Sequence, residues 1–362
     1  MYYYRIAAVI LQSPYRLRSF SYFACEPAEA DIILTETKEL PPDRADQVSG
    51  MIAIRHSADG WFFHAGKSDR EGLFVSKDYS SLRLLGYPKT EIYGMAEWFV
   101  RIAVECMLAY KGYVSLHSAA VEINGEAYAF TGPSGMGKST RAQAWIDAMG
   151  AELINGDRPL IDVRNMDLYG VPWDGKEQCF RNVHYPLKAI CDVRRSESVY
   201  VRRMTVMQRR KLLMQQCFIP MWDTETAAIQ IANINRIASS DKVIRTFCGP
   251  TTEDARALYG AIQKQQISEE DKDMKANPGF ILRNVVDEYI LMPTGDNIGK
   301  FNGTVLLNEA SALVWEKLQN PVSREDLLKA ILDEFEVEKA VAAADLDALL
   351  AKLKEYGVIS ED

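Results

Sequence analysis

The stretch of sequence that decides the fold is Gly132-Pro133-Ser134-Gly135-Met136-Gly137-Lys138-Ser139-Thr140. It fits the Gly-x4-Gly-Lys-Ser/Thr pattern of a P-loop. The context is the one this pattern requires, because a strand-like run, Glu126–Thr131, leads into it and apolar residues at helical spacing follow it. Gly150 is placed to end that helix. The spacing therefore predicts an α/β domain built around a strand–loop–helix unit, and a chance glycine-rich turn is the alternative.

The residue types of this loop are those that bind phosphate groups. Glycines allow backbone amides to turn inward around phosphate oxygens, and the helix that begins near Lys138 adds the positive end of its dipole. We expect the Lys138 ammonium to contact the β- and γ-phosphates and the Ser139 hydroxyl to coordinate Mg²⁺, so the predicted cofactors are ATP and Mg²⁺. The predicted nucleotide contacts are Gly132, Ser134, Gly135, Met136, Gly137, Lys138, Ser139 and Thr140.

The composition excludes several other classes of protein. The chain has 362 residues, of which 48% are apolar and 25% charged, so it is long enough for two or three domains that need no disulfide to fold. The net charge of −8 argues against nucleic acid as the main partner. The apolar run Ile6–Leu11 is too short for a signal peptide or a membrane span, so we expect a cytoplasmic protein. Scattered cysteines and only four histidines argue against a zinc site.

Two polar residues lie on either side of the loop in sequence. His117 stands in Leu116-His117-Ser118-Ala119-Ala120, at the start of the hairpin before the loop, and Asp157 follows the next predicted strand, Glu152–Asn155. The run from His117 to Val163 resembles the catalytic domain of HPr kinase/phosphorylase and its bacterial relatives. Those relatives include kinases that phosphorylate ribosomally made peptides such as lasso-peptide precursors, and their nucleotide site is similar to that of phosphoenolpyruvate carboxykinase.

The resemblance implies a catalytic role for each of these residues. In that family, a His on the strand before the P-loop is paired with one or two Asp on the strand after it. The resemblance implies that Asp157 takes the proton of the acceptor hydroxyl and helps Ser139 to hold the metal. His117 would position groups or transfer a proton near the phosphates. The catalytic candidates are thus Asp157, His117 and Lys138, and the alternatives are a turn Asp and a structural His.

The sequence departs from the family pattern at one position. Family members carry an Asp-Asp pair, and its first position is Gly156 here. Either Asp157 serves as both metal partner and base, or another acid supplies one role, or catalysis is weak. Asp162 is nearby in sequence, but it lies deeper along the chain and is the poorer substitute.

Two further stretches are candidates for contacts with phosphate or peptide. Tyr169–Glu177 resembles a Gly-Pro-Trp loop near the active site of peptide-kinase relatives, where Lys176 would contact phosphate and Asp174 or Glu177 would replace the missing acid. A solvated turn is the alternative. The basic run between Arg194 and Lys211 would meet an acidic peptide or phosphate, but such runs are more often a solvated face.

The N-terminal part of the sequence predicts a β-rich region closed by a helix. Its candidate strands are Tyr2–Leu11, Asp31–Thr35, Met51–Arg55, Trp61–His64 and Leu73–Val75. Asp59-Gly60 is a hairpin signal, and Gly94–Tyr110 carries apolar side chains at helical spacing. A strand over Tyr113–Ile123 and helices over residues 203–217 and 253–264 are predicted after it. Nothing in the first region indicates chemistry.

The C-terminal part predicts a smaller, separate domain of two strands and three helices. Ser268–Gly279 is charged and closed by Pro-Gly, as in a linker. The segments Phe280–Arg283, Glu288–Met292, Leu307–Trp315 and Tyr356–Ile359 resemble the PqqD family. The resemblance implies a small winged-helix-like fold that binds the leader segment of a precursor peptide by strand addition. An ordinary winged-helix module is the alternative, and the acidic chain argues against DNA as its ligand.

Together these features predict a chain of four parts. A β-rich region over 1–110 precedes an α/β P-loop kinase core, similar to HPr kinase and phosphoenolpyruvate carboxykinase, over 111–265. A linker over 266–279 and a PqqD-like domain over 280–362 follow. The predicted function is ATP-dependent transfer of the γ-phosphoryl to a Ser or Thr hydroxyl of a ribosomally synthesised precursor peptide.

The predicted partner is that leader-containing peptide, with no nucleic acid and no membrane. HPr kinases assemble as oligomers, so the resemblance leaves a homo-oligomer open. Two other functions remain as alternatives. One is a small-molecule or carrier-protein kinase/phosphorylase, and the other is a non-catalytic nucleotide-binding chaperone that presents the peptide to another enzyme.

Overall fold

The computed structural model describes residues 1–42, 47–49, 52–57, 59–65, 70–86, 91–173, 175, 179, 181–264, 267–268, 274–285, 288–297 and 305–361. Contacts divide the chain into two compact units, Met1–Ser268 and Glu269–Asp362. Each unit has hydrophobic cores of its own. No helix in the described ranges combines the length and the apolar character that a membrane span needs.

The N-terminal part of the first unit is an eight-stranded sheet that packs on helix α1 (Met95–Tyr110). Its strands run in the order β1-β2-β4-β9-β8-β7-β6-β5. Their bounds are β1 (Tyr2–Ile6), β2 (Val9–Ser13), β4 (Ile32–Thr37), β5 (Gln47–Ser49), β6 (Ile52–Ser57), β7 (Gly60–His64), β8 (Gly72–Ser76) and β9 (Ser81–Leu85). A short parallel pair, β3 (Arg16–Leu17) and β10 (Glu91–Ile92), and the 3-10 helix η1 (Ser19–Phe23) complete it. The apolar face of α1 is buried in the same core as this sheet.

Two turns of this region differ from the sequence prediction. The predicted strand Tyr2–Leu11 is a hairpin, because Ile6 pairs with Val9 and Ala7 takes a positive φ of 48°. The alternation of apolar residues continues through the turn and hides it. Gly60 begins β7 instead of occupying the predicted turn, since it pairs with Ser57. A Cβ at Gly60 would lie 2.0 Å from the Val75 carbonyl oxygen, so close strand packing is what requires this glycine.

The second part of this unit is a ten-stranded mixed sheet. Its main path is β11-β15-β16-β17-β13-β12-β14, and β19, β18 and β20 extend it beyond β17. The bounds are β11 (Tyr113–Ser115), β12 (Ser118–Ile123), β13 (Glu126–Thr131), β14 (Glu152–Asn155), β15 (Leu160–Asp162), β16 (Asp167–Tyr169), β17 (His184–Arg195), β18 (Tyr200–Arg203), β19 (Val243–Cys248) and β20 (Ile267–Ser268). Strands β13, β17 and β19 are parallel neighbours. The predicted strand Glu126–Thr131 and the predicted strand Glu152–Asn155 are confirmed.

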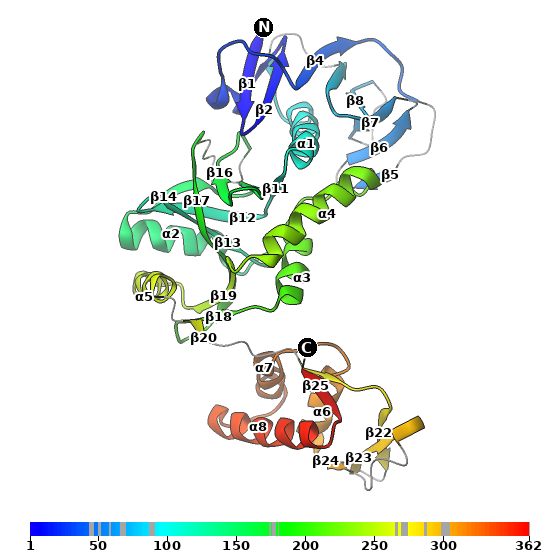
Figure 1. Cartoon of the computed structure of the whole chain (residues 1–362), viewed down its shortest axis with the longest axis vertical. Coiled ribbons are helices and arrows are strands. Elements are labelled where there is room, and N and C mark those ends of the chain that lie inside the picture. Colours follow the sequence, from blue (N-terminus) through cyan, green and yellow to red (C-terminus); the bar gives the residue numbers. More distant parts are fainter. Residues whose placement is uncertain are drawn as a thin grey trace. The chain divides into compact units, whose positions relative to one another are not determined.

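Helices cover both faces of the ten-stranded sheet. Figure 1 shows α2 and α5 on one side and α3 and α4 on the other. Their bounds are α2 (Lys138–Met149), α3 (Val206–Gln216), α4 (Thr224–Ser239) and α5 (Thr252–Gln263). Trp145 of α2 is fully buried against Tyr128 and Phe130. This arrangement is an α/β fold, as the loop pattern predicts.

The sequence prediction missed one of these helices and placed another too early. Helix α4 is rich in Ile, Thr and Asn, which have modest helix propensity, so its local pattern is weak. Asp223 caps it by accepting from the Glu225 and Thr226 amides, and tertiary packing buries its face. Helix α3 begins at Val206 because Arg203 still belongs to β18.

The predicted strand Tyr113–Ile123 is wrong as a single element. It breaks after Ser115, because β11 pairs with β15 while β12 pairs with β13 and β14. The two parts thus belong to different neighbours in the sheet. His117 lies in the break between them, where side chains do not have to alternate between the two faces of the sheet.

The second unit holds a three-stranded sheet, three helices and a two-stranded pair. The sheet order is β22 (Phe280–Val285), β23 (Glu288–Pro293) and β24 (Val305–Leu307). The helices are α6 (Glu309–Lys317), α7 (Arg324–Glu334) and α8 (Lys339–Glu355), with the 3-10 turn η2 (Gly295–Asn297) before β24. One core joins the helices to the sheet, with Trp315 and Leu346 almost fully buried.

The predicted linker is partly a structured element of this second unit. β21 (Met274–Ala276) pairs antiparallel with β25 (Ile359–Glu361), and Met274 is 3% exposed in the C-terminal core. The charged composition around it conceals this strand, because its burial depends on a partner about 85 residues later in the chain. The domain therefore begins before residue 280.

Candidate functional site

The glycine loop, Gly132–Gly137, joins the end of β13 to the start of α2. Gly132, Gly135 and Gly137 have φ angles of 140°, 79° and 90°, a region of backbone space that favours glycine. Gly137 is the N-cap of α2 and supplies no side-chain cap. A tight loop followed by the uncapped N-terminus of a helix is a geometry that can hold an anion.

Lys138 is the first residue of α2, and its ammonium turns back over the loop. Its Nζ donates to the carbonyl oxygens of Gly132 at 3.1 Å and Pro133 at 3.4 Å. Burial lowers the pKa of Lys138, the nearby Asp157 carboxylate raises it and Arg158 lowers it. Lys138, the residue predicted to bind phosphate, therefore lies within range of a charge interaction with Asp157, the acid that follows β14.

The other predicted contacts lie around the same loop. Ser134 and Gly135 are exposed, and the half-buried Met136 donates its amide to the Pro133 carbonyl at 3.3 Å. Ser139 and Thr140 have exposed side chains in the first turn of α2. Their hydroxyls are available to a ligand at this end of the helix.

A buried asparagine, which sequence reasoning missed, shapes the turn that holds Asp157. The Asn155 side-chain oxygen accepts from the amides of Asp157 at 3.0 Å and Arg158 at 2.8 Å. Its Nδ2 donates to the Trp173 carbonyl at 2.8 Å, and the Trp173 indole donates to the Arg158 carbonyl at 3.2 Å. Asn155 is fully buried, so its amide fixes the turn from both sides. The only local signal was an Asn at the end of a strand.

His117 and Asp157 meet across this site, as the sequence predicts. His117 Nε2 lies 3.8 Å from Asp157 Oδ1, and both side chains are about one-third exposed. Backbone bonds fix the pair, because Ser118 donates its amide to the Asp157 carbonyl at 2.9 Å and His117 donates its amide to Gln216 at 2.8 Å. Thr131, the last residue of β13, donates its hydroxyl to the His117 carbonyl at 2.9 Å.

The electrostatics of the site favour a neutral His117. Burial lowers the pKa of His117 from its ordinary value of 6.5, and the Lys138 and Arg158 cations lower it further, whereas Asp157 raises it. The imidazole is therefore neutral at pH 7, and its closeness to Asp157 is a contact between a neutral ring and a carboxylate. A neutral imidazole can accept or relay a proton.

Arg158 is a second residue that sequence reasoning did not assign. Its charge acts on both His117 and Lys138. Its Nη1 is buried and has no hydrogen-bond partner in the described part of the chain. Among the described residues, the site brings together two cations (Lys138 and Arg158), the Asp157 carboxylate and the His117 imidazole beside the glycine loop.

Asp192 of β17 lies beneath the glycine loop and was also missed. It is fully buried, pairs in register with Thr131 and makes ion pairs with Arg194 at 3.1 Å and Arg245 at 3.0 Å through Oδ2. Its other oxygen, Oδ1, has no partner among the described residues and lies 3.5 Å from where a Cβ at Gly132 would be. The signal that could have identified Asp192 was an acidic residue near the end of a buried strand that neighbours β13, the strand before the loop.

The oxygens available for a magnesium ion are few. No group of three or more His, Cys, Asp or Glu that could hold a metal occurs within the described ranges. The exposed Ser139 hydroxyl and the one-third-exposed Asp157 carboxylate are hard oxygen donors. They fit Mg²⁺, which keeps several waters and takes one or two carboxylates in protein sites. Gly156 contributes no donor from its side chain.

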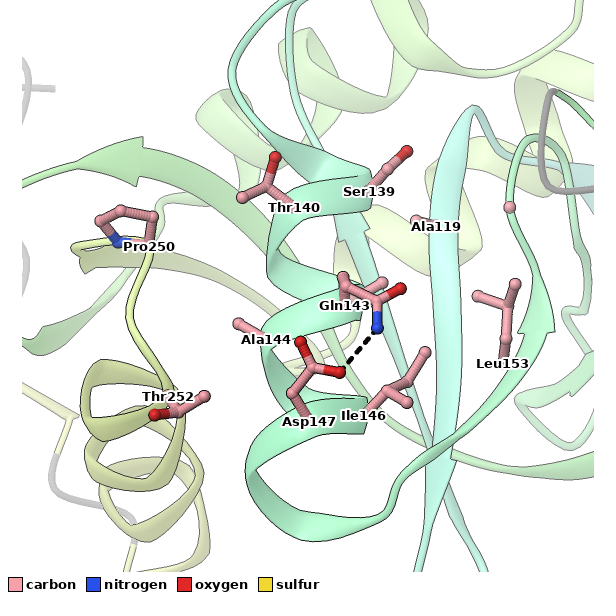
Figure 2. Close-up of a pocket in the computed structure, with 12 residues that line it drawn as sticks. Ala119, Ser139, Thr140, Gln143, Ala144, Ile146, Asp147, Leu153, Pro250 and Thr252 are labelled. Atoms are coloured by element: carbon pink, nitrogen blue, oxygen red, sulfur yellow. Dashed lines mark hydrogen bonds between the residues drawn. The ribbon is translucent and has the colours of Figure 1, made fainter.

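Two cavities adjoin the start of α2. One, of about 450 Å³, runs from Ser139 along the helix past Ile146 and reaches Leu153 and Gly156. Figure 2 shows the Ser139 and Thr140 hydroxyls at the N-terminal end of α2 and the hydrogen bond from Gln143 to Asp147 further along. The other, of about 530 Å³, lies against Gly137, Thr140 and the chain from Cys248 to Pro250.

The two weaker sequence candidates have different outcomes. Asp174, Lys176 and Glu177 lie outside the described residues. The basic run is partly engaged inside the protein, because Arg194 pairs with Asp192 and Arg195 donates to the Gly135 carbonyl at 2.9 Å. It is therefore not a free face along its whole length.

The second unit presents a strand edge beside an apolar cavity. Among the described strands, β24 pairs only with β23, so its outer edge is open. Leu306, in the middle of β24, is 61% exposed. A cavity of about 190 Å³ begins at Asn308, directly after β24, and is lined by Val314, Ile331 and Leu346 among others.

Comparison with known proteins bears on this second unit. The family model described as Coenzyme PQQ synthesis protein D (PqqD) matches residues 288–359. The second unit carries a PqqD-like domain. This match confirms the family resemblance of the C-terminal part and covers β23, β24 and the three helices, whereas β22 lies before it.

Two solved structures are also similar to part of the chain. "TbiB1 in Complex with the TbiA(beta) Leader Peptide" is 19% identical, with 24% of this chain and 94% of that chain covered and a TM-score of 0.21. "Lasso peptide synthetase B1 complexed with the leader peptide" is 25% identical, with 24% of this chain and 98% of that chain covered and a TM-score of 0.21. No curated protein matches the chain.

Proposed function

We propose that the protein is an ATP-dependent kinase that phosphorylates a Ser or Thr hydroxyl of a ribosomally made precursor peptide. The observation that carries this proposal is the meeting of His117, Lys138 and Asp157 at the mouth of the glycine loop. A loop that can hold phosphates thus lies next to one carboxylate with a free path to solvent. This is the arrangement that transfer to a hydroxyl needs.

The residues divide the work of the transfer. Bound Mg-ATP supplies the phosphoryl group and offsets its charge. The loop amides and Lys138 would bind the phosphates, and Ser139 and Asp157 would coordinate the Mg²⁺ ion. Asp157 would accept the proton of the acceptor hydroxyl. The hydroxyl oxygen would form a bond to the γ-phosphorus while the bond between that phosphorus and the bridging oxygen of the β-phosphate breaks, and ADP would leave. Arg158 adds a cation to the charge that develops there.

The missing first acid restricts how this site works. With Gly156 before it, Asp157 is the one carboxylate among the described residues whose charge acts on both Lys138 and His117. Asp157 therefore serves both the metal and the proton. Neutral His117, 3.8 Å away, is placed to take the proton onward and free the carboxylate.

The PqqD-like domain gives the kinase its peptide partner. An open edge at β24 provides backbone donors and acceptors for an added strand, while Leu306 and the cavity after Asn308 provide apolar contacts for alternate side chains. We assign this edge to the leader segment of the precursor. Binding the leader raises the local concentration of the segment that carries the hydroxyl.

The test is intact-mass spectrometry of precursor peptides encoded beside this gene, incubated with the full chain and Mg-ATP. We expect the peptide to gain 80 Da per phosphate, and Lys138→Ala to lower the rate at least about 100-fold because it removes a charge that stabilises the transition state. Arg256→Ala, an exposed change on α5 away from the loop, is the matched control. Incorporation by Lys138→Ala at the wild-type rate contradicts the assignment of the site.

Two other results would replace the proposal. Efficient phosphorylation of free serine or of a carrier protein, without any on peptides, favours a small-molecule or carrier-protein kinase. ATP binding without turnover on any acceptor favours the chaperone, which Gly156 makes a specific alternative.

A further inference from the structure

A large polar cavity lies in the N-terminal part of the first unit and is not used by the proposed nucleotide site. It has a volume of about 990 Å³. Its walls come from β3, η1, the chain before α1, the first turn of α1 and Gly175. We call it the Arg18 cavity, and the residues that matter for the argument are Arg16, Arg18, Tyr22, Tyr93, Glu97 and Gly175.

The Arg18 cavity is connected to the catalytic turn through Trp173. The Trp173 indole donates to the Arg158 carbonyl, and its own carbonyl accepts from Asn155. Its ring packs against Phe20 of η1, with centroids 6.1 Å apart. Gly175, two residues further on and within about 7 Å by chain length, lines the cavity. One aromatic side chain thus contacts both the wall of this cavity and the turn that holds Asp157.

The cavity contains two arginines, Arg16 and Arg18, and two glutamates, Glu91 and Glu97, of which Arg18 is the cation without an ion pair among the described residues. Arg18 is exposed, and its guanidinium makes no ion pair or side-chain hydrogen bond within the described residues. Arg16 is shared with Glu91 at 3.9 Å, a long contact between side chains that are more than 40% exposed. The Glu97 carboxylate already accepts the Ser19 amide at 2.8 Å, and burial raises its pKa.

The aromatic groups favour a peptide as the occupant. Tyr22 and Tyr93 are 66% and 60% exposed at the cavity, in a protein that buries most of its large apolar rings. Tyr and Arg side chains are the residue types enriched where proteins bind peptides and other proteins, because they combine apolar area with hydrogen bonding. The guanidinium of Arg18, which lines the same cavity, can form paired hydrogen bonds with a carboxylate of that peptide.

We infer that the Arg18 cavity binds the acceptor segment of the substrate peptide, through a peptide carboxylate at Arg18 and side-chain contacts at Tyr22 and Tyr93. The inference rests on the proposed function and deepens it. The PqqD-like domain holds the leader, and the Arg18 cavity holds the part of the peptide near the hydroxyl. The N-terminal part of the first unit, in which the sequence indicated no chemistry, then forms the substrate side of the kinase.

The experiment measures binding to the full chain with Mg-ADP by fluorescence anisotropy. Three labelled nonapeptides, each with one central Ser, serve as probes: one with Glu at three positions and an amidated end, one with Gln at those positions and an amidated end, and the Gln peptide with a free C-terminal carboxylate. We expect the wild-type chain to bind at least one carboxylate peptide about tenfold more tightly than the neutral peptide, and Arg18→Gln to abolish that preference. Arg5→Gln, an exposed arginine on β1 outside the cavity, should keep it.

The first two probes test a side-chain carboxylate and the third tests a terminal one. Equal binding of all three by the wild-type chain, or an unchanged preference in Arg18→Gln, overturns the inference. Phosphate incorporation is followed in parallel by intact mass. If Arg18→Gln keeps the wild-type KM for a peptide that is phosphorylated, the cavity assignment fails and the kinase stands. If no peptide gains phosphate while the Arg18-dependent preference persists, the kinase fails and the cavity stands.

Discussion

Single residues of the site owe their chemistry to their neighbours in space. His117 is a histidine of ordinary type whose environment contains burial and two cations, Lys138 and Arg158, and these outweigh the attraction of Asp157. Neutral His117 can therefore accept a proton from Asp157 without itself adding a charge to the resting site. The same neighbours make the ionisation of this one side chain a direct test of the site's geometry.

The first prediction concerns the titration of His117. Its pKa should lie below its ordinary value of 6.5, and Arg158→Met should raise the pKa because it removes one of the cations that disfavour imidazolium. NMR of the imidazole carbons across pH 4–8 measures both values. Lys111→Met is the control, since Lys111 is paired with Asp31 elsewhere. A His117 pKa above 6.5, or a His117 pKa that does not change in Arg158→Met, would contradict the structure.

The sign of the stability effect follows from the same shift. Between the folded pKa of His117 and about 6.5, the unfolded chain binds more protons than the folded chain. The free energy of unfolding therefore rises with pH through that window, and the contribution of this residue is lost as the pH falls through it. Arg158→Met should narrow this pH range, because it should raise the pKa of His117 in the folded protein toward the unfolded value.

At the scale of an element, the glycine loop and a neighbouring hairpin allow a matched comparison. Gly135 of the loop and Gly125 of the β12–β13 turn have φ angles of 79° and 78°, and a Cβ would meet nothing within 4 Å at either position. An alanine at each site costs about 1–2 kcal/mol of backbone strain. The two sites differ in what their backbone does, because only the loop presents its amides beside Lys138.

The second prediction uses this pair. Gly135→Ala and Gly125→Ala should lower the free energy of unfolding by similar amounts, on the order of 1 kcal/mol, measured by urea denaturation. Gly135→Ala alone should weaken ADP binding, by about tenfold or more in calorimetry, because a strained loop no longer directs its amides inward. Equal ADP affinity for both variants would show that the loop does not hold the phosphates.

At the scale of the whole molecule, the chain joins two units with separate cores. The first carries the candidate kinase site and the second the PqqD-like domain. Under the proposed function, a peptide bound by its leader is tethered to the chain, and its acceptor segment then meets the candidate kinase site at a raised effective concentration. Leader binding should therefore act on KM for the peptide and leave the chemistry of transfer unchanged.

The third prediction tests that division with the two edges of the C-terminal sheet. Leu306→Asp on β24 should raise the KM for a leader-bearing peptide about tenfold or more, with kcat and the KM for a leaderless peptide unchanged. Ile281→Asp on the opposite edge strand, β22, is the control, since Ile281 is also exposed. A larger effect from Ile281→Asp would indicate that the leader binds at β22 instead of β24. No effect from either variant would contradict leader binding by this sheet.

Much of the fold follows from local sequence. Helix α2 begins at Lys138 and ends before Gly150, as predicted, because glycines on each side take positive φ angles that other residues resist. Helix α1 runs to Tyr110, and β13 and β14 match their predicted bounds. The hairpin at Ala7 was missed because the apolar alternation continues through its turn. Helix α4 and strand β21 have weak local patterns, and their packing partners lie elsewhere in the chain.

The candidate site divides in the same way. The sequence by itself determined the glycine loop and the position of Lys138, because spacing and residue type carry these features within a short stretch of chain. The pairing of His117 with Asp157 and the PqqD-like domain were implied by resemblance to known families. Only the tertiary structure decided the roles of Asn155 and Asp192 and the Arg18 cavity. Each of these depends on which elements lie side by side. The Asn155 amide, the Asp192 Oδ1 oxygen and the Arg18 guanidinium, the last two without a partner among the described residues, have surroundings made by segments that are far apart in the sequence.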